Sequence, residues 1–344
     1  MYPPGIHALG GILASDSGTA LTAWARWSPI AFGVLAVLGM FVLGQRLGGP
    51  VAGLTAALLT AIIPEHIFRT ELYFPTALDL ALLPAYLLAF VMATDEASEK
   101  PQRIGGMVLF GLLTPALAFT HPWAVPLFLV PAAIYLALGV VRAGGGFRVA
   151  IDRLVPGATM VVVAFAFALS SRWDHTESGF ATFFDHLGPL SLLSRLTLSG
   201  PALFPIFLAV LALAAAAAVI VAALVASVKL PRLVRIGLGS ACALAGPAMI
   251  KTLVAPPPSG VNYRNMLGLV AIWLVLAGVA LAFIRPTAIG QMGIAMGAVL
   301  LPLTAIDIFS SPFWPQRTVA YLTIAVALLG ASVSNEGTSS ARLG

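Results

Sequence analysis

Long apolar runs separated by short polar breaks make up most of this chain. About 20 apolar residues are needed for a helix to cross the roughly 30 Å hydrocarbon core of a bilayer. Eleven runs meet or approach that length: residues 28–45, 51–67, 73–94, 104–121, 122–141, 154–171, 203–228, 236–254, 266–284, 290–309 and 318–333. The pattern predicts an all-α fold, a polytopic bundle of about eleven transmembrane helices in a single domain over residues 1–333. A polar, disordered tail is expected at residues 334–344.

Composition supports a membrane protein and excludes a soluble one. Hydrophobic residues make up 60% of the 344 residues and charged residues 9%, with a mean hydropathy of +1.00. The net charge of +5 comes from Lys and Arg scattered through short loops, which is typical of topology signals. No nucleic-acid partner is therefore expected. The single cysteine, Cys242, excludes an intrachain disulfide and a multi-thiolate metal site.

The distribution of basic residues predicts the orientation. The loops at residues 142–153 and 229–235 each carry three basic residues, and two predicted spans separate them, so both are placed in the cytoplasm. Alternation then puts eleven of the 18 basic residues inside and all five histidines outside. We therefore expect an integral, multi-pass protein of the plasma membrane whose functional site faces outward.

The polar break after the second predicted span is the first candidate for that site. The run PEHIFRTELYFP (residues 64–75) forms a very short outer turn next to Pro64, where a broken helix at a cavity is expected. Arg69 can pair with Glu65 four residues earlier, or bind a phosphate with its planar guanidinium. His66 lies beside that pair, at the level of the lipid headgroups.

Three further positions are candidates, each with an alternative that the sequence leaves open. Asp79 lies about two turns below the outer end of its span, where it is either catalytic or paired with Lys251 or Arg69. His121, before Pro122, is either a proton relay or a helix cap. Lys251 and Arg264 flank a Pro-Pro-Pro turn and would form an anion-binding cluster with Arg69.

The metal requirement is also open. The outer loop at residues 171–200 contains two Asp-His pairs and a glutamate, which would suit a divalent cation such as Mg²⁺ or Mn²⁺. The spacing is not that of a known metal motif, and a solvated polar loop is the better explanation. The sequence therefore assigns no metal ligand.

The amino-terminal part of the chain resembles a known superfamily. YPPGIHALGGIL (residues 2–13), followed by AGLTAALLTAIIPEHIFRT (residues 52–70), is similar to the amino-terminal half of GT-C membrane glycosyltransferases, which include the oligosaccharyltransferase catalytic subunits. The likeness extends over about residues 2–95. In these enzymes an outer loop bearing a catalytic aspartate precedes the YPP element. The chain is accordingly expected to be a fragment that lacks a first helix, and to be inactive as written if that loop is missing.

The resemblance implies roles for residues at the outer face. Tyr2 and His7 would line the outer site, Arg69 and Arg264 would contact the lipid phosphate, and Glu71 or Asp79 would supply the acidic groups. With the candidates from the polar breaks added, the expected catalytic residues are Glu71, Asp79 and His121, and the expected substrate-binding residues are Tyr2, His7, His66, Arg69, Lys251 and Arg264. The Trp-Trp-Asp motif with which oligosaccharyltransferases read their acceptor peptide is absent. Transfer to asparagine is therefore not expected.

The function implied is transfer of a sugar from a polyprenyl-phosphate donor to a lipid or glycan acceptor outside the cytoplasm. Donor and membrane lipids are the expected partners. Two alternatives remain open at this point. One is a transporter or lipid flippase, which would place charges at the membrane midplane and show related halves of sequence. The other is a non-catalytic membrane subunit of a glycan-assembly complex.

Overall fold

The computed structural model describes residues 10–12, 18–64, 66–67, 75–95, 98–120, 124–143, 155–164, 232–253, 262–283, 287–310 and 315–334. Helices account for nearly all of this part of the chain. A ten-residue helix covers Val155–Ala164. Nine longer helices are α2 (Gly18–Gly48), α3 (Pro50–Ile62), α5 (Pro75–Thr94), α6 (Lys100–Thr120), α7 (Ala124–Ala143), α12 (Arg232–Leu253), α13 (Asn262–Phe283), α14 (Ala288–Ser310) and α15 (Pro315–Ser334).

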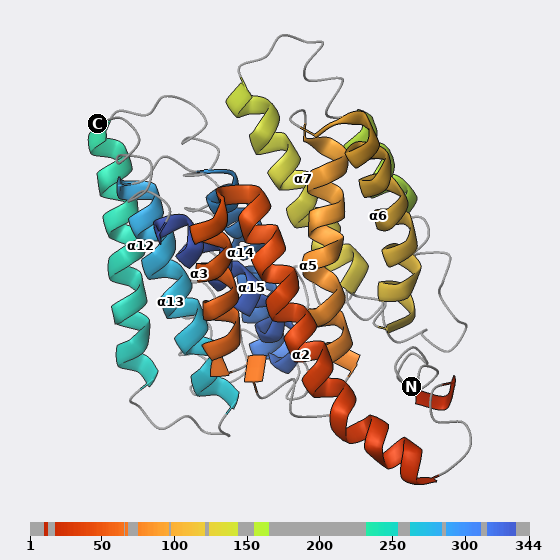
Figure 1. The fold of residues 1–344 in the computed structure, drawn as a ribbon. Coiled ribbons are helices and arrows are strands. Elements are labelled where there is room, and N and C mark those ends of the chain that lie inside the picture. The colour runs from red at the N-terminus through yellow and green to blue at the C-terminus, as the bar shows by residue number, and fades with distance from the viewer. Residues whose placement is uncertain are drawn as a thin grey trace.

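The long helices run side by side and form one bundle (Figure 1). Neighbours in sequence pack as antiparallel pairs: α2 with α3, α5 with α6, α12 with α13, and α14 with α15. Contacts between distant parts of the chain join these pairs, because α2 also packs on α5, α15 packs on α3 and α13, and α14 packs on α7. The bundle thus brings together helices from both halves of the sequence.

The helices confirm the all-α bundle expected from the apolar runs. Nine of the eleven predicted spans overlap the long helices, and the span 154–171 is described as a helix over Val155–Ala164. The remaining span, 203–228, lies outside the described residues. Helix α2 begins ten residues before its predicted span, at Gly18. The predicted start of this span was the first residue of the apolar run. A helix can continue beyond the membrane boundary as long as its residues favour helical structure, so α2 begins earlier.

Helix α3 ends earlier than predicted, at Ile62 rather than residue 67. The next residue, Ile63, is extended, with φ −67° and ψ 120°. A residue before proline is pushed out of the α region by the proline ring, and Pro64 has this effect here. The chain then makes a tight turn in which the N–H groups of His66 and Ile67 both donate to the carbonyl of Ile63. The break expected at Pro64 is confirmed.

Small residues face inward on α3, and large apolar residues face outward. The buried positions are Ala52, Gly53, Ala56 and Thr60, and the exposed large ones are Val51, Leu54, Leu58 and Ile62. A Cβ on Gly53 would lie 2.7 Å from the carbonyl oxygen of Phe41, so α2 and α3 approach closely only because this residue is glycine. Small buried residues and large exposed apolar residues are typical of helices in lipid, because close packing between helices there takes the place of the hydrophobic effect.

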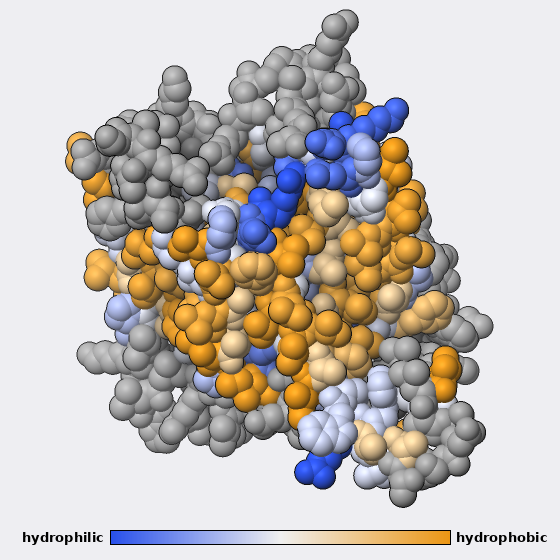
Figure 2. All heavy atoms as spheres, viewed as in Figure 1, coloured by the Kyte–Doolittle hydropathy of each residue, from blue (hydrophilic) through white to orange (hydrophobic). Residues whose placement is uncertain are grey.

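The exterior of the bundle is apolar around its middle. In Figure 2, apolar residues form a broad band across the face shown, with hydrophilic residues above it and at one lower corner. Three described helices have the length and hydropathy needed to cross a bilayer: Ala20–Gly48, Thr76–Thr94 and Lys100–Thr120. Helix α15 is buried between its neighbours, with Val319–Leu329 at most 2% exposed, and this stretch is accordingly apolar on nearly all sides.

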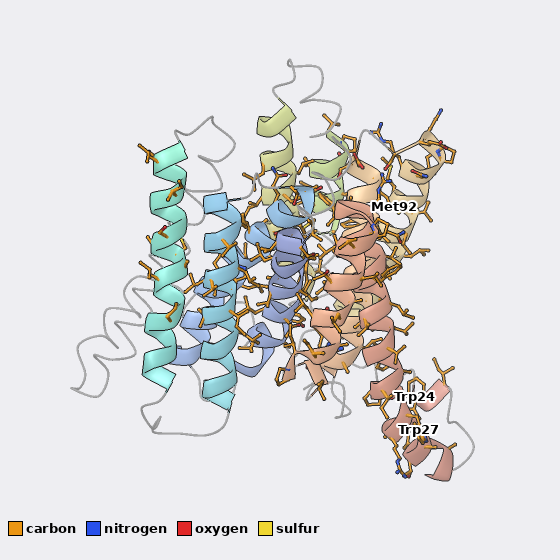
Figure 3. All side chains as sticks on the ribbon, turned by 60° about the vertical axis from the view of Figure 1, so that its left-hand side comes forward. Trp24, Trp27 and Met92 are labelled. Carbon is orange, nitrogen blue, oxygen red and sulfur yellow. The ribbon has the colours of Figure 1, made fainter. Side chains whose placement is uncertain are left out.

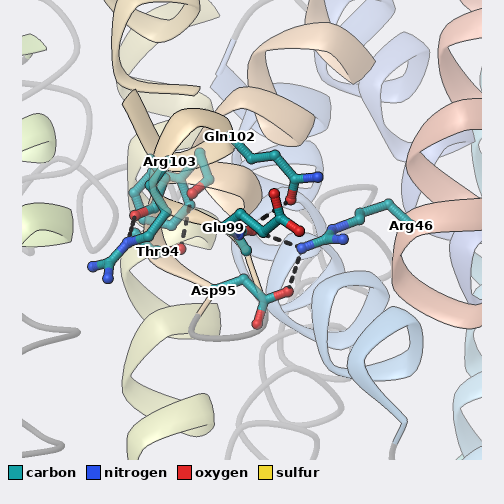
Figure 4. Close-up of polar contacts among 9 residues, drawn as sticks. Arg46, Thr94, Asp95, Glu99, Gln102 and Arg103 are labelled. Atoms are coloured by element: carbon teal, nitrogen blue, oxygen red, sulfur yellow. Dashed lines mark hydrogen bonds and ion pairs between the residues drawn. The ribbon is translucent and has the colours of Figure 1, made fainter. Parts of the chain in front are cut away.

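A polar cluster lies at the end of the bundle where α2 ends and α6 begins (Figure 4). The Arg46 guanidinium donates through Nη2 to Asp95 Oδ2 at 2.8 Å and to Ser98 Oγ at 2.6 Å. Arg103 Nε donates to the carbonyl of Ala93 at 3.4 Å. These contacts tie the C-terminal end of α2 to the link between α5 and α6.

We expect the Arg46–Asp95 pair to add little to stability. The two side chains are 29% and 35% exposed, and solvent screens such a pair, so a double-mutant cycle of Arg46→Gln and Asp95→Asn should give a coupling of about 0.5–1 kcal/mol. Denaturant unfolding of the purified protein measures it. Lys100→Gln, at an exposed neighbouring position, should change the unfolding free energy by less than about 0.5 kcal/mol. A coupling above about 2 kcal/mol would contradict a screened pair.

Candidate functional site

We call one end of the bundle the outer end: it carries the starts of α2, α5, α7, α13 and α15 and the ends of α3, α6, α12 and α14. The opposite end, with Arg46 and Asp95, is the inner end. In Figure 1 the outer end is the lower one, where α2 projects beyond its neighbours. The names follow the orientation predicted from the basic loops.

Tryptophans mark the outer end of α2. Figure 3 shows Trp24 and Trp27 on its projecting part and Met92 near the other end of the bundle. Trp27 is 61% exposed and lies beneath the Arg26 guanidinium, whereas the Trp24 ring packs edge-on against Phe32. From Trp24 to Arg46 the helix rises about 33 Å, which matches the thickness of a hydrocarbon core. The two residues therefore fit opposite membrane interfaces.

The core of the candidate site is a buried pair between α5 and α15. Tyr321 Oη donates to Asp79 Oδ2 at 2.9 Å, and both side chains are at most 1% exposed. The Phe128 ring of α7 packs edge-on against the Tyr321 ring at 5.1 Å between centroids. Tyr321 thus links three helices, since it bonds to Asp79 of α5 and packs on Phe128 of α7. An ionisable side chain held in this way inside a membrane bundle is a candidate functional group, since its burial is costly.

The depth of the Asp79–Tyr321 pair in the bundle follows from where α5 and α15 begin. Asp79 lies four residues into α5 and Tyr321 six residues into α15, so they are about 6 and 9 Å from the outer ends of their helices. The sequence places Asp79 about two turns below the outer end with Lys251 or Arg69 as its partner, whereas in the structure it lies about one turn into α5 and bonds to Tyr321. Tyr321 was missed. The signal in the sequence was a hydroxyl at matching depth in the run VAYLTIAVALL (residues 319–329), which otherwise holds only one further polar side chain, Thr323.

His66 is buried between the end of α3 and α2. It is 3% exposed, and a hydrogen bond joins its ring to the backbone of Gly33. Burial lowers the pKa of His66 below its usual range, and the bond to Gly33 opposes that shift. The imidazole thus packs inside the bundle, between the end of α3 and α2.

Two basic candidates are placed by their helices. Lys251 lies in the last turn of α12 and Arg264 in the first turn of α13. Because α12 and α13 pack against each other in antiparallel fashion, the two positions share the outer end with His66 and Asp79. Five candidates lie outside the described residues: Tyr2, His7, Arg69, Glu71 and His121.

A metal centre is not formed by the part of the chain that the structure describes. No three His, Cys, Asp or Glu side chains come together among those residues. The Asp-His pairs of the loop at residues 171–200 lie outside them. The chemistry that the described residues offer is thus a buried carboxyl–phenol pair and a buried imidazole, all near one end of the bundle.

Comparison with known proteins gives a family and several structural likenesses. The model of a family of unknown function, DUF6541, matches residues 1–245. No curated protein matches the sequence. Among solved structures, the chain is similar to the apo oligosaccharyltransferase of Archaeoglobus fulgidus, at 18% identity and a TM-score of 0.47, covering 97% of this chain and 42% of that one.

Two other solved structures contain lipid phosphates. The same archaeal enzyme, AglB, in complex with an inhibitory peptide and a dolichol-phosphate is 17% identical, with a TM-score of 0.46 and the same coverage. ArnT from Cupriavidus metallidurans bound to undecaprenyl phosphate is 16% identical, with a TM-score of 0.39, covering 99% of this chain and 69% of that one. The chain spans less than half the length of the archaeal enzyme.

Proposed function

The chain belongs to the DUF6541 family, and we propose that it is an integral membrane glycosyltransferase of the GT-C type. It would transfer a sugar from a polyprenyl-phosphate donor to a lipid or glycan acceptor at the outer end of the bundle. The observation that carries the proposal is the gathering of chemical groups at this one end: His66, Asp79 and Tyr321 by their side chains, and Lys251 and Arg264 by their helices.

The role proposed for each acidic residue and for His121 follows from its burial or from its position in the chain. Asp79 is fully buried and accepts a hydrogen bond from Tyr321, so its role is to fix α5 against α15 beside the outer turn. Glu71, four residues before α5 in the sequence, would then deprotonate the acceptor hydroxyl or hold a divalent cation. His121 begins the link between α6 and α7 and would relay the proton outward.

Two arginines would stabilise the leaving group. When the bond between sugar and phosphate breaks, negative charge develops on the polyprenyl phosphate, and guanidinium groups bind such an oxyanion through paired N–H donors. Arg69, in the outer turn, and Arg264, at the start of α13, are the candidates, with Lys251 nearby at the end of α12. Tyr2 and His7 are proposed to line the same site. A flippase would instead place such groups near the membrane midplane.

The test is transfer by arginine variants of the complete natural protein. It is reconstituted in liposomes with undecaprenyl phosphate carrying a radiolabelled hexose and with native membranes as acceptor. Arg69→Ala and Arg264→Ala should each lower the rate by about tenfold or more, since a charge-assisted hydrogen bond contributes about 1.5–3 kcal/mol. The readout is label leaving the polyprenyl fraction.

The matched control is Arg26→Ala. Arg26 lies at the same end of the bundle, is exposed and stacks on Trp27. Its replacement by alanine should leave transfer unchanged. Undiminished transfer by both Arg69→Ala and Arg264→Ala would remove the proposed mechanism. Movement of labelled lipid across the liposome membrane without a glycan product would favour the flippase.

A further inference from the structure

A cleft opens at the inner end of the bundle, between α2, α5 and α6. Its volume is about 390 Å³, and six residues line it: Val42, Gln45, Arg46, Leu88, Met92 and Gln102. It lies at the opposite end from the candidate active site, as the position of Met92 in Figure 3 shows. None of the residues assigned to sugar transfer lines this cleft.

The lining changes from apolar to polar along the membrane normal. On α2, Val42 lies one turn deeper in the bundle than Arg46, and on α5, Leu88 lies one turn deeper than Met92. Gln102 belongs to the first turn of α6, at the inner end. An apolar wall that meets polar groups at the level of the interface matches the acyl, glycerol and headgroup zones of a phospholipid.

The charges at the rim are of both signs. Around the end of α2, the basic side chains of Arg46 and Arg103 lie near the carboxylates of Asp95 and Glu99 (Figure 4). Arg46 uses Nη2 for Asp95 and Ser98, and its side chain, which is 29% exposed, also lines the cleft. A guanidinium at this place suits a phosphate oxygen, whereas the carboxylates suit a primary ammonium group.

We propose that this cleft binds one aminophospholipid, of the phosphatidylethanolamine type, from the inner leaflet. Its phosphate is held by Arg46, its ammonium group lies toward Asp95 and Glu99, and an acyl chain lies along Val42 and Leu88. A purely anionic phosphatidylglycerol would meet the two carboxylates without a compensating charge. Phosphatidylcholine has no N–H group to donate to them. The lipid would bridge α2 to the α5–α6 pair.

The purified full-length protein in detergent provides the test. Phosphatidylethanolamine at a fixed mole fraction should raise the unfolding temperature by about 5 °C, because a ligand that binds only the folded state stabilises it. Phosphatidylcholine and phosphatidylglycerol should each give less than half of that shift. Native mass spectrometry should show one retained phosphatidylethanolamine per chain.

Two variants and a control localise the effect. Val42→Trp fills the cleft from a position that is already 44% exposed, and Arg46→Gln removes the phosphate donor. Both should abolish the selective shift and the retained lipid. Leu112→Trp, on the exposed face of α6 outside the cleft, should preserve both. Equal shifts with the three lipids, or a selective shift that survives Val42→Trp, would overturn the proposal.

Discussion

Replacing Gly278 with leucine should leave almost no folded protein that can be purified in detergent. Helices α12 and α13 touch at this residue: a Cβ on Gly278 would lie 2.5 Å from the carbonyl oxygen of Gly239 and 2.6 Å from the amide nitrogen of Ala243. Both atoms belong to the backbone of α12, so no side-chain rotation relieves the overlap. The helices would have to separate, and α13 would then lose its packing on α15.

The size of the effect follows from how a packed interior responds to added volume. Even one extra methyl group that forces backbone shifts costs about 1–3 kcal/mol, so Gly278→Ala should lower the unfolding temperature by several degrees. Leucine adds three more heavy atoms at the same point. Gly246 of α12 makes a similar contact with α13, since a Cβ there would lie 2.7 Å from the carbonyl oxygen of Ala271. Helices α12 and α13 therefore cannot shift toward each other at Gly246 to relieve an overlap at Gly278.

Gly237→Leu is the matched control. It lies on α12, two residues from Gly239, and a Cβ there would meet nothing within 4 Å. Leucine favours a helix over glycine by about 0.5–1 kcal/mol, and this variant should be as stable as the natural protein or slightly more so. Fluorescence-detected gel filtration and thermal unfolding measure both variants. A monodisperse Gly278→Leu protein of unchanged stability would show that α12 and α13 are not packed in this way.

The sequence predicts the helices well because lipid leaves the backbone few choices. In hydrocarbon every N–H and C=O must be bonded within its own segment, so each long apolar run becomes a helix. What hydropathy does not predict is where a helix ends. Helix α2 continues outward to Gly18 through Trp24 and Arg26, which tolerate the interface, and Ile63 ends α3 because proline follows it.

The site is predicted less completely than the fold. Depth in the membrane can be read from the sequence, and it placed Asp79, Lys251 and Arg264 at one end. Which helices touch cannot be read in this way. Tyr321 lies 242 residues from Asp79 and reaches it only because α15 passes close to α5 in the centre of the bundle. That the side chains of Lys251 and Arg264 lie close to the donor phosphate remains a prediction.

The second large effect is expected at Asp79. Replacing it with alanine should lower the free energy of unfolding by about 2–4 kcal/mol, because the buried Tyr321 hydroxyl loses its acceptor and a small cavity is left. Tyr321→Phe should cost about as much, since a buried carboxyl group then loses the donor that satisfies Oδ2. The double variant should be less destabilised than the sum of the two single ones.

Asp79→Asn separates a structural from a catalytic role. The amide oxygen still accepts the hydrogen bond from Tyr321, so we expect stability to change by less than about 1 kcal/mol. If Asp79 acts by holding α5 against α15, sugar transfer should also survive in this variant, whereas Asp79→Ala should lose transfer and stability together. Thermal unfolding and the radiolabelled transfer assay are run on the same preparations.

The outcome that would reassign Asp79 is a split between the two measurements. A loss of transfer of about a hundredfold in Asp79→Asn, at unchanged unfolding temperature, would mean that the carboxylate itself takes part in the chemistry, because only its ability to ionise has been removed. Glu71→Gln provides the comparison. As the proposed base in the outer turn, it should lose transfer without changing stability, since it lies outside the buried Asp79–Tyr321 contact that joins the helices.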